Sequence, residues 1–213
     1  MAGMSSLWPQ PASDVLEAVA SRRPAPGGGA TAALTGSFGT ALLSMAGAIT
    51  VRKRGEDEAL ARTLAHLSEL RGRLQTLADE DVAVFRAYVD ASRRPKGTEQ
   101  ERHGREAALR AAGQAAMNVP LTLARTVVEA LSLAPGLAGQ SHPEVVSDVG
   151  AGAAILEGAL HAALLTVEIN LPHVSVEERA VIGAERNRLE ARGHELAAEA
   201  LHLTRERLPR GRA

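Results

Sequence analysis

The chain has 213 residues, 45% of them hydrophobic and 23% charged, which is typical of one soluble globular domain over residues 1–213. Its 24 Lys and Arg residues balance 25 Asp and Glu residues, and the formal net charge of -1 argues against a general nucleic-acid binder. The chain has no cysteine, which excludes disulfides, cysteine-ligated metals and thiol catalysis and favours a cytoplasmic protein. Because it has only two Phe, one Tyr and one Trp among many Ala and Leu, helices are expected rather than sheets.

The first quarter of the chain predicts two helices with a firm break between them. Met1–Gln10 shows no signal-peptide pattern, and Ser13 is suited to cap a short first helix. Two prolines and three glycines then interrupt the chain before a helix predicted over Ala30–Val51. The whole stretch Pro24–Val51 is uncharged and long enough to span a bilayer. Its small residues outnumber large aliphatic ones, which favours a buried helix over a membrane span.

This uncharged helix has two different apolar faces. One is a stripe of large side chains, and the other is a row of small residues that would let another backbone approach closely. We expect the helix to be buried, within the subunit or at an interface between two copies. The large stripe is Leu34, Phe38, Leu42, Met45 and Ile49, and the small row is Ala32, Gly36, Thr40, Ser44 and Ala48.

A charge-rich helix follows, predicted over Glu56–Ala91. Its apolar residues recur at steps of three and four, as in a packed bundle helix, and Asp81 interrupts them. This apolar seam consists of Leu60, Leu64, Leu67, Leu70, Leu74, Leu77, Val84 and Tyr88.

The second half of the chain predicts further helices. Thr98 and Glu101 form a capping box, and Pro120 is expected to kink the helix because it cannot bond to the carbonyl of Ala116. Two prolines and two glycines predict a loop over Leu133–Glu144. The predicted fold is all-α, a bundle of about six helices. The later helices are predicted over Ala107–Met117, Leu121–Leu133, Ser147–Asn170 and Val176–Leu208.

Asp81 is the first candidate for chemistry. A carboxylate in an apolar seam is partly buried, which raises its pKa and suits acid–base catalysis. Phe85 and Tyr88 lie on the same helix face, where they could wall a flat heterocycle. The alternative is that Asp81 is solvated together with its acidic neighbours.

The glycine turn Pro26-Gly27-Gly28-Gly29 opens the uncharged helix. Free N–H groups at a helix start favour an anion, and glycines allow close approach. Lys53 or Lys96 could assist by binding a substrate carboxylate. The alternatives are a plain flexible turn, with Lys53 complementing the helix dipole and Lys96 solvated.

Ser147 and Asp148 open the second charge-poor helix, either as an N-cap pair or as a second carboxylate aimed into a site. Asn170 ends that helix, where a left-handed cap is the simplest role. Glu157 and His161 have metal-ligand spacing but no third ligand, so a hydrogen bond between them is favoured.

Taken together, the motifs PAPGGGATAAL, TVRK, DEDVAVF, RPKGT, NVPL, VVSDVG and VEINL resemble the cyclodeaminase/cyclohydrolase family in order and spacing. That family includes the cyclodeaminase half of formiminotransferase-cyclodeaminase and stand-alone methenyltetrahydrofolate cyclohydrolases. The resemblance covers about Ser13 to Leu208. It implies an all-helical homodimer with a folate site at or near the dimer interface. From composition and charge we expect no membrane and no nucleic acid as partner.

The resemblance also carries roles onto residues of this chain. It implies a catalytic Asp81, and it matches the family's PGGGS, Pro-Lys, Ser-Asp and Ile-Asn motifs, including Asn170. The chain departs from the family at Ala30, Thr166, Arg52 and His142–Glu144, which affects the expected substrate contacts. The matched motif residues are Pro26 to Ala30, Pro95 and Lys96, Ser147 and Asp148, and Ile169 and Asn170.

Both family reactions act on one carbon held between N5 and N10 of tetrahydrofolate. Each passes through a tetrahedral carbon and moves protons, so a carboxylate suffices and no metal or redox cofactor is needed. No formiminotransferase half is expected, which favours the cyclohydrolase, conversion of 5,10-methenyltetrahydrofolate to 10-formyltetrahydrofolate. The alternatives are formiminotetrahydrofolate cyclodeaminase, which releases ammonia, and a non-catalytic folate-binding or scaffold bundle.

Overall fold

The computed structural model describes residues 6–55 and 57–208. Over these residues the chain forms six α-helices and two 3₁₀ helices and no strand, which confirms the all-α prediction. The helix start expected at Glu56 lies outside the described residues. The elements are α1 (Ala12–Ala20), α2 (Gly28–Arg54), α3 (Glu58–Ser92), α4 (Glu99–Gln140), η1 (Pro143–Val145), α5 (Val146–Asn170), η2 (Leu171–His173) and α6 (Val176–Arg207).

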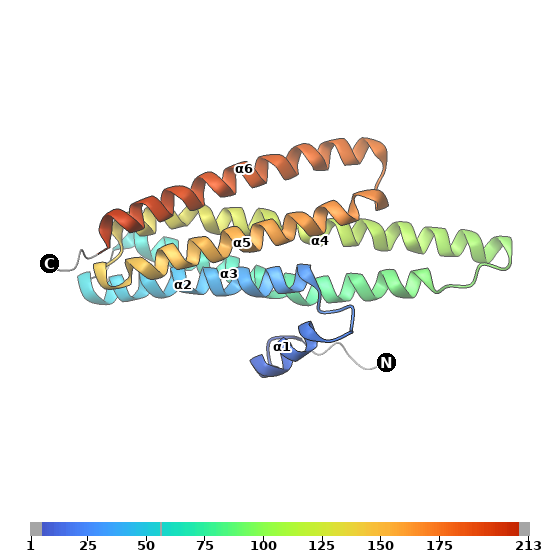
Figure 1. Ribbon diagram of the computed structural model, residues 1–213, viewed down its shortest axis with the longest axis horizontal. Helices are drawn as coiled ribbons and strands as arrows, with labels where there is room; N and C mark the ends of the chain where they lie inside the picture. Colours follow the sequence, from blue (N-terminus) through green and yellow to red (C-terminus); the bar gives the residue numbers. More distant parts are fainter. Residues whose placement is uncertain (1–5, 56, 209–213) are drawn as a thin grey trace.

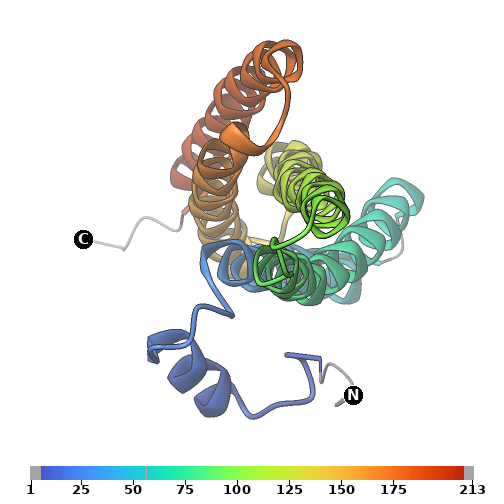
Figure 2. The same cartoon turned by 90° about the vertical axis from the view of Figure 1, so that its right-hand side faces the viewer.

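Five long helices form an elongated bundle (Figure 1). Helix α2 packs on α3 and α5, while α4 packs on α3, α5 and α6. The end of α3 and the start of α4 project beyond the other helices as a two-helix arm (Figure 1). Helix α1 lies outside the bundle (Figure 2), and none of its residues is buried.

Helix starts agree with the sequence in some places and not in others. The capping box of Thr98 and Glu101 is present at α4. Ser13 and Ser147 cap nothing, because α1 starts after Pro11 and α5 continues directly from η1. Both serines lie inside the first turn of their helices.

The loop predicted over Leu133–Glu144 is wrong in its first part, because α4 continues to Gln140 with both Pro120 and Pro135 inside it. Burial of Ala134, Leu137 and Ala138 stabilises this last stretch despite Pro135. Its final carbonyls also accept hydrogen bonds, since Arg54 Nη1 donates to Gln140 O at 2.6 Å.

In α2 the small residues face the core of the bundle, although burial of the large side chains would be the simpler expectation. Ala32, Gly36 and Thr40 of the small row are buried against the other helices. In the large stripe Phe38 is 61% and Met45 39% exposed, while Leu34 and Ile49 are partly buried against the core. Small residues face the core because α3 and α5 approach α2 closely, and this leaves an apolar outer surface on α2.

The backbones of α2 and α5 approach each other closely. A Cβ on Gly152 would lie 2.9 Å from the carbonyl oxygen of Gly39, and a Cβ on Gly39 would lie 3.0 Å from that of Gly152. Both neighbours are backbone atoms that cannot rotate away. Helix α2 is therefore held to α5 by a contact between two glycines. The first turn of α2 also carries Gly29 and Ala30, which contact Asp81.

We expect Gly152→Ala to destabilise the protein by about 1–3 kcal/mol, because the methyl group forces the two backbones apart. Thermal unfolding measures this. Gly158→Ala is the matched control on the same helix, where a Cβ meets nothing within 4 Å. It should be neutral or stabilising, since alanine favours helix more than glycine does. Equal melting temperatures for the two variants would show that the contact is loose.

Three stretches are long and apolar enough to cross a bilayer by length and composition: α2, α4 and Pro143–His173. Half of the apolar window in α2 and in Pro143–His173, and 61% of that in α4, is buried inside the bundle. Much of their apolar surface therefore serves the core of the bundle, as expected for the uncharged stretch of α2.

Candidate active site

A cavity of about 350 Å³ lies where α2 begins, beside the second half of α3 and the end of α5. It brings together Asp81, the last three residues of the glycine turn, Phe85, Tyr88 and Asn170, all candidates from the sequence. Pro26 is buried beside it and lines a neighbouring hollow instead. The lining residues are Pro24, Ala25, Gly27, Gly28, Gly29, Asp81, Val84, Phe85, Tyr88, Ala116, Thr166, Ile169, Asn170 and His173.

Asp81 is held against the start of α2. Its Oδ2 accepts a hydrogen bond from the N–H of Ala30 at 2.8 Å. A Cβ on Gly29 would lie only 2.1 Å from Asp81 Oδ1, so the carboxylate occupies the space that a side chain there would fill. The glycine at this position therefore has a specific purpose, which is to admit the carboxylate of Asp81 to the helix start.

This arrangement changes the interpretation of the glycine turn. Of the first N–H groups of α2, that of Ala30 bonds to Asp81 and that of Thr31 bonds to the carbonyl of Gly27. The protein's own carboxylate thus acts as the anion at this helix start.

The pKa of Asp81 is raised above its ordinary value of 3.8. Burial of the carboxylate is the larger cause, and the hydrogen bond from Ala30 opposes it in part. Among the described residues Asp81 is the only carboxylate that lines the cavity. A partly buried carboxylate with a raised pKa is suited to exchange protons with a bound molecule.

Gly28 leaves the cavity open on the side of α5. A Cβ on Gly28 would meet only Thr166 Oγ1, at 3.9 Å, and the residue itself is exposed. The hydroxyl of Thr166 donates to the carbonyl of Ala162 within its own helix. Gly28 and Thr166 therefore face each other across the entrance without touching.

Asn170 is fixed by a proline on another helix. Pro120 has no N–H to give to Ala116, and Asn170 Nδ2 donates to the carbonyl of Ala116 instead, at 2.9 Å. The same nitrogen donates to Thr166 O. Asn170 has right-handed helical geometry with φ −91°, so the predicted left-handed cap is wrong. Because Nδ2 binds two carbonyls, Oδ1 is left as an acceptor.

His173 is a cavity residue that the sequence did not single out. Its ring lies 4.9 Å from the ring of Tyr88, and Nδ1 is 3.5 Å from the Tyr88 hydroxyl. Its Cβ packs against Gly113 of α4, where an added Cβ would lie 3.0 Å away. The signal available in the sequence was its place three residues after Asn170.

Asp148 and Ser147 are not part of this cavity. They lie in the first turn of α5, whereas Thr166 and Asn170 lie in the last. At 1.5 Å per residue, Asp148 is about 27 Å from Thr166 along the helix. Ser147 lines a separate hollow between α5 and α6. Within one subunit, the two predicted carboxylates do not act together.

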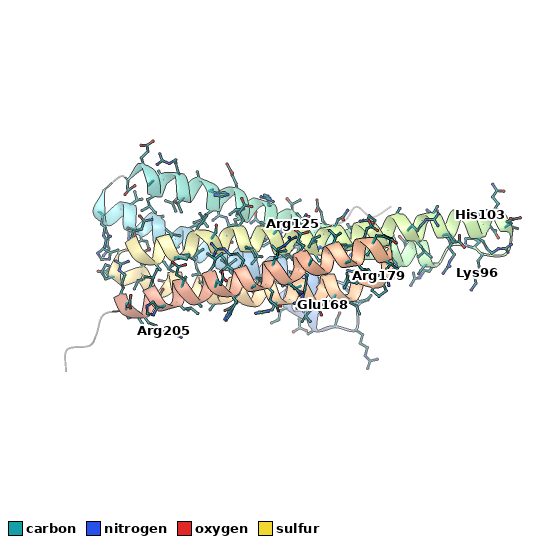
Figure 3. All side chains as sticks on the ribbon, turned by 90° about the horizontal axis from the view of Figure 1, so that it is seen from above. Lys96, His103, Arg125, Glu168, Arg179 and Arg205 are labelled. Carbon is teal, nitrogen blue, oxygen red and sulfur yellow. The ribbon has the colours of Figure 1, made fainter. Side chains whose placement is uncertain are left out.

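The two candidate lysines are also distant from the glycine turn. Lys53 lies in the last turn of α2, about 38 Å from Gly28 along the helix, and pairs with Glu144. That pairing lowers the pKa of Glu144. Lys96 lies at the tip of the two-helix arm, beside His103 (Figure 3). Neither lysine joins the glycine turn within one subunit.

No group of three or more His, Cys, Asp or Glu side chains that could hold a metal occurs among residues 6–55 and 57–208. Glu157 and His161 do not bond to each other. Glu157 Oε1 lies 2.8 Å from His194 Nδ1, and His161 lies 3.7 Å from Glu190, so both reach across to α6.

The fold and the cavity together define an all-helical protein with a partly buried carboxylate in a cavity at the start of its second helix. Residues 11–188 match the family model described as formiminotransferase-cyclodeaminase. The chain therefore belongs to the formiminotransferase-cyclodeaminase family, as its motifs indicate.

Relatives with two different names are similar to this chain in sequence. Methenyltetrahydrofolate cyclohydrolase of Methylorubrum extorquens is 35% identical over 73% of this chain and 76% of its own length. Formimidoyltransferase-cyclodeaminase of Gallus gallus is 33% identical over 81% of this chain and 32% of its own length. The chain thus spans about a third of that larger relative.

A solved structure has the same fold. Formiminotetrahydrofolate cyclodeaminase of Thermotoga maritima superposes with a TM-score of 0.81, covering 92% of this chain and 96% of that one at 24% identity. Its helical architecture agrees with the bundle described above.

Proposed function

We propose that this protein hydrolyses 5,10-methenyltetrahydrofolate to 10-formyltetrahydrofolate. The observation that carries the proposal is the carboxylate of Asp81, partly buried with a raised pKa in a cavity that has aromatic walls. Methenyltetrahydrofolate is a cation, and a carboxylate stabilises a cation held beside it. The cyclohydrolase relative, which the chain matches over most of both lengths, supports the same reaction.

In the proposed mechanism Asp81 acts first as a base. It takes a proton from the water that attacks the bridging carbon, and a tetrahedral carbon bearing a hydroxyl forms. The bond from this carbon to N5 then breaks as a proton reaches N5. The hydroxyl loses its proton to solvent, so one proton is released overall and the formyl group stays on N10. Proton transfer by a positioned carboxylate contributes about 10²–10⁴ in rate.

The remaining cavity residues would bind the ligand rather than react with it. Phe85 and Tyr88 offer aromatic faces to the flat pterin ring. Gly28 leaves room for the ring at the entrance, and Asn170 Oδ1 can accept from its amino group. No metal or other cofactor is part of this proposal.

Cyclodeaminase activity is the second candidate. The relatives named formimidoyltransferase-cyclodeaminase support it, and the same carboxylate would serve. In that reaction N10 attacks the formimino carbon, and ammonia leaves after it is protonated. A folate-binding bundle without activity is the third candidate, which the departures at Ala30 and Thr166 motivate.

One pair of assays separates the three. Purified protein is mixed with 5,10-methenyltetrahydrofolate in a buffer where spontaneous hydrolysis is slow, and loss of the methenyl absorbance is followed. In parallel, 5-formiminotetrahydrofolate is supplied and ammonia is measured. We expect faster loss of methenyl absorbance and little ammonia. Ammonia as the main product would assign the cyclodeaminase, and tight binding without turnover would assign the non-catalytic bundle.

We also propose that the protein is a cytoplasmic homodimer. The outward face of α2 is apolar, and the neighbouring face of α5 exposes Leu165 (63%) and Ile169 (73%). Ile169 also lines the cavity, so a second copy on this face would cover the cavity edge. The proposal includes no membrane and no nucleic acid as partner.

We expect light scattering to give the mass of a dimer at micromolar concentration. Phe38→Glu should shift the protein toward monomer, because a charge on this apolar face is costly to bury between two copies. Leu16→Glu, on the exposed surface of α1, is the control and should leave the mass unchanged. A wild-type protein that is monomeric at this concentration, or that partitions onto lipid vesicles, would contradict the proposal.

A further inference from the structure

The mechanism above leaves one proton without an assigned donor. As the bond from carbon to N5 breaks, N5 must receive a proton, and at the same moment Asp81 has just taken one from water. A second group that is already protonated would make the two steps independent. Histidine is the side chain whose ordinary titration lies nearest to neutral pH.

We propose that His173 is the general acid that protonates N5, an assignment that rests on the proposed function. His173 donates its ring proton to N5 as the bond from carbon to N5 breaks and the carbonyl of the formyl group forms. It then regains a proton from solvent, and Asp81 releases to solvent the proton that it took from water, so one proton is still released overall. Asp81 and His173 thus divide the proton transfers between them.

The geometry of the cavity suits this division. Tyr88, whose ring is tilted by 53° to the ring of His173, lies seven residues after Asp81, about 10 Å further along α3. Asp81 of α3 and His173 of η2 line the same cavity, so both side chains lie against a molecule bound there. A ligand in this cavity can therefore have Asp81 beside the water that attacks the bridging carbon and His173 beside N5.

His173 is an exposed residue whose backbone is held in place. Its Cβ and carbonyl oxygen pack against Gly113, and Tyr88 lies against the ring. The carbonyls on either side of it, of Pro172 and Val174, accept from the guanidinium of Arg179. With Nδ1 facing the tyrosine hydroxyl, Nε2 is the nitrogen left to act on a ligand.

The charged groups around His173 come from two helices. Asp81 of α3 lines the same cavity, and the guanidinium of Arg179 of α6 donates to the carbonyl of Pro172 beside His173. Tyr88 of α3 supplies a neutral hydroxyl. Helix α4 presents Gly113 and Ala116, which carry no charge.

The test compares the pH dependence of turnover in the wild type, His173→Gln and His103→Gln. A general acid works only while protonated, so it produces the fall in rate at high pH, whereas the base Asp81 produces the fall at low pH. We expect His173→Gln to lose about 100-fold in turnover and to lose the high-pH fall, with substrate affinity changed less than about threefold. His103→Gln, at the tip of the arm (Figure 3), should match the wild type.

A purely structural His173 would give a different result. Loss of packing alone would lower stability or affinity but leave both limbs of the pH profile, and that outcome overturns the proposal. If His173→Gln does not fold, NMR of the wild-type protein tests the proposal through the ring resonances of His173 and His103. Binding of 5-formyltetrahydrofolate should shift only those of His173, and an unshifted His173 overturns the proposal. A wild type that turns over neither substrate overturns the proposed function instead.

Discussion

Replacing Asp81 with Asn is expected to lower turnover by about 100-fold or more. The amide has the size of the carboxylate and its Oδ1 can still accept from the N–H of Ala30, so the start of α2 stays intact. It cannot take a proton from water. Folate affinity should change far less than turnover, and steady-state kinetics with a separate binding measurement distinguishes the two.

The same variant should be more stable than the wild type, and the difference should depend on pH. Because burial raises the pKa of Asp81, the folded state holds its proton more tightly than the unfolded state does. This contribution to stability is complete below 3.8, the ordinary pKa, and is lost as pH rises through the raised value. The melting temperature of Asp81→Asn should therefore exceed that of the wild type most at neutral pH.

Asp148→Asn is the matched control for this experiment. Asp148 lies in the first turn of α5, at the opposite end of that helix from the cavity, and Asn is again close in size. We expect near wild-type turnover. If Asp148→Asn loses turnover while Asp81→Asn keeps it, the acid–base group has been assigned to the wrong carboxylate, and a site shared between two subunits becomes the better explanation.

Gly28→Val is expected to weaken folate binding by about 10-fold or more while the protein remains folded. The valine side chain has space in the empty protein, because its Cβ meets only Thr166 Oγ1 at 3.9 Å. That space is the cavity entrance, so the side chain occupies volume that the ligand needs. A loss of 10-fold corresponds to about 1.4 kcal/mol of binding free energy. Ligand titration by fluorescence or calorimetry measures it.

Gly136→Val controls for the change of residue type. Gly136 is an exposed position of α4 where a Cβ meets nothing within 4 Å, and it does not line the cavity. This variant should bind folate like the wild type. Equal folate affinities for Gly28→Val and the wild type would contradict this prediction and leave the glycine turn with a structural role only.

The sequence predicts the core of α3 well, because a helix with a single apolar seam leaves one way to pack. Leu60, Leu67, Leu70, Leu74 and Leu77 are all buried as the spacing indicates. Asp81 stands out for the same reason, since it breaks the seam. Its partner at Gly29 could not be predicted, because that contact joins residues 52 positions apart in the chain.

Helix α2 shows where the sequence is ambiguous. Its large and small faces are both apolar, and periodicity cannot say which of them faces the core. The decision depends on how closely α3 and α5 approach, which the contact between Gly39 and Gly152 sets. Large side chains such as Phe38 are then left outside.

For several candidate site residues, the local sequence pattern does not show which other helix they contact or how far they lie from the cavity. Asn170 was singled out for its place at a helix end, but its actual partner is the carbonyl that Pro120 leaves free on a different helix. His173 carried no local pattern and is brought to the cavity only by η2 packing on Gly113. Lys53 and Asp148 lie at the opposite ends of their helices from the site, a consequence of helix length that local motifs do not convey.

A crystal structure with 5-formyltetrahydrofolate, a stable analogue that carries a one-carbon group on N5, tests the central claim most directly. We expect the pterin between Phe85 and Thr166, with the one-carbon group within hydrogen-bonding distance of the Asp81 carboxylate and N5 on the side of His173. A ligand bound at a site that does not include Asp81 would contradict it.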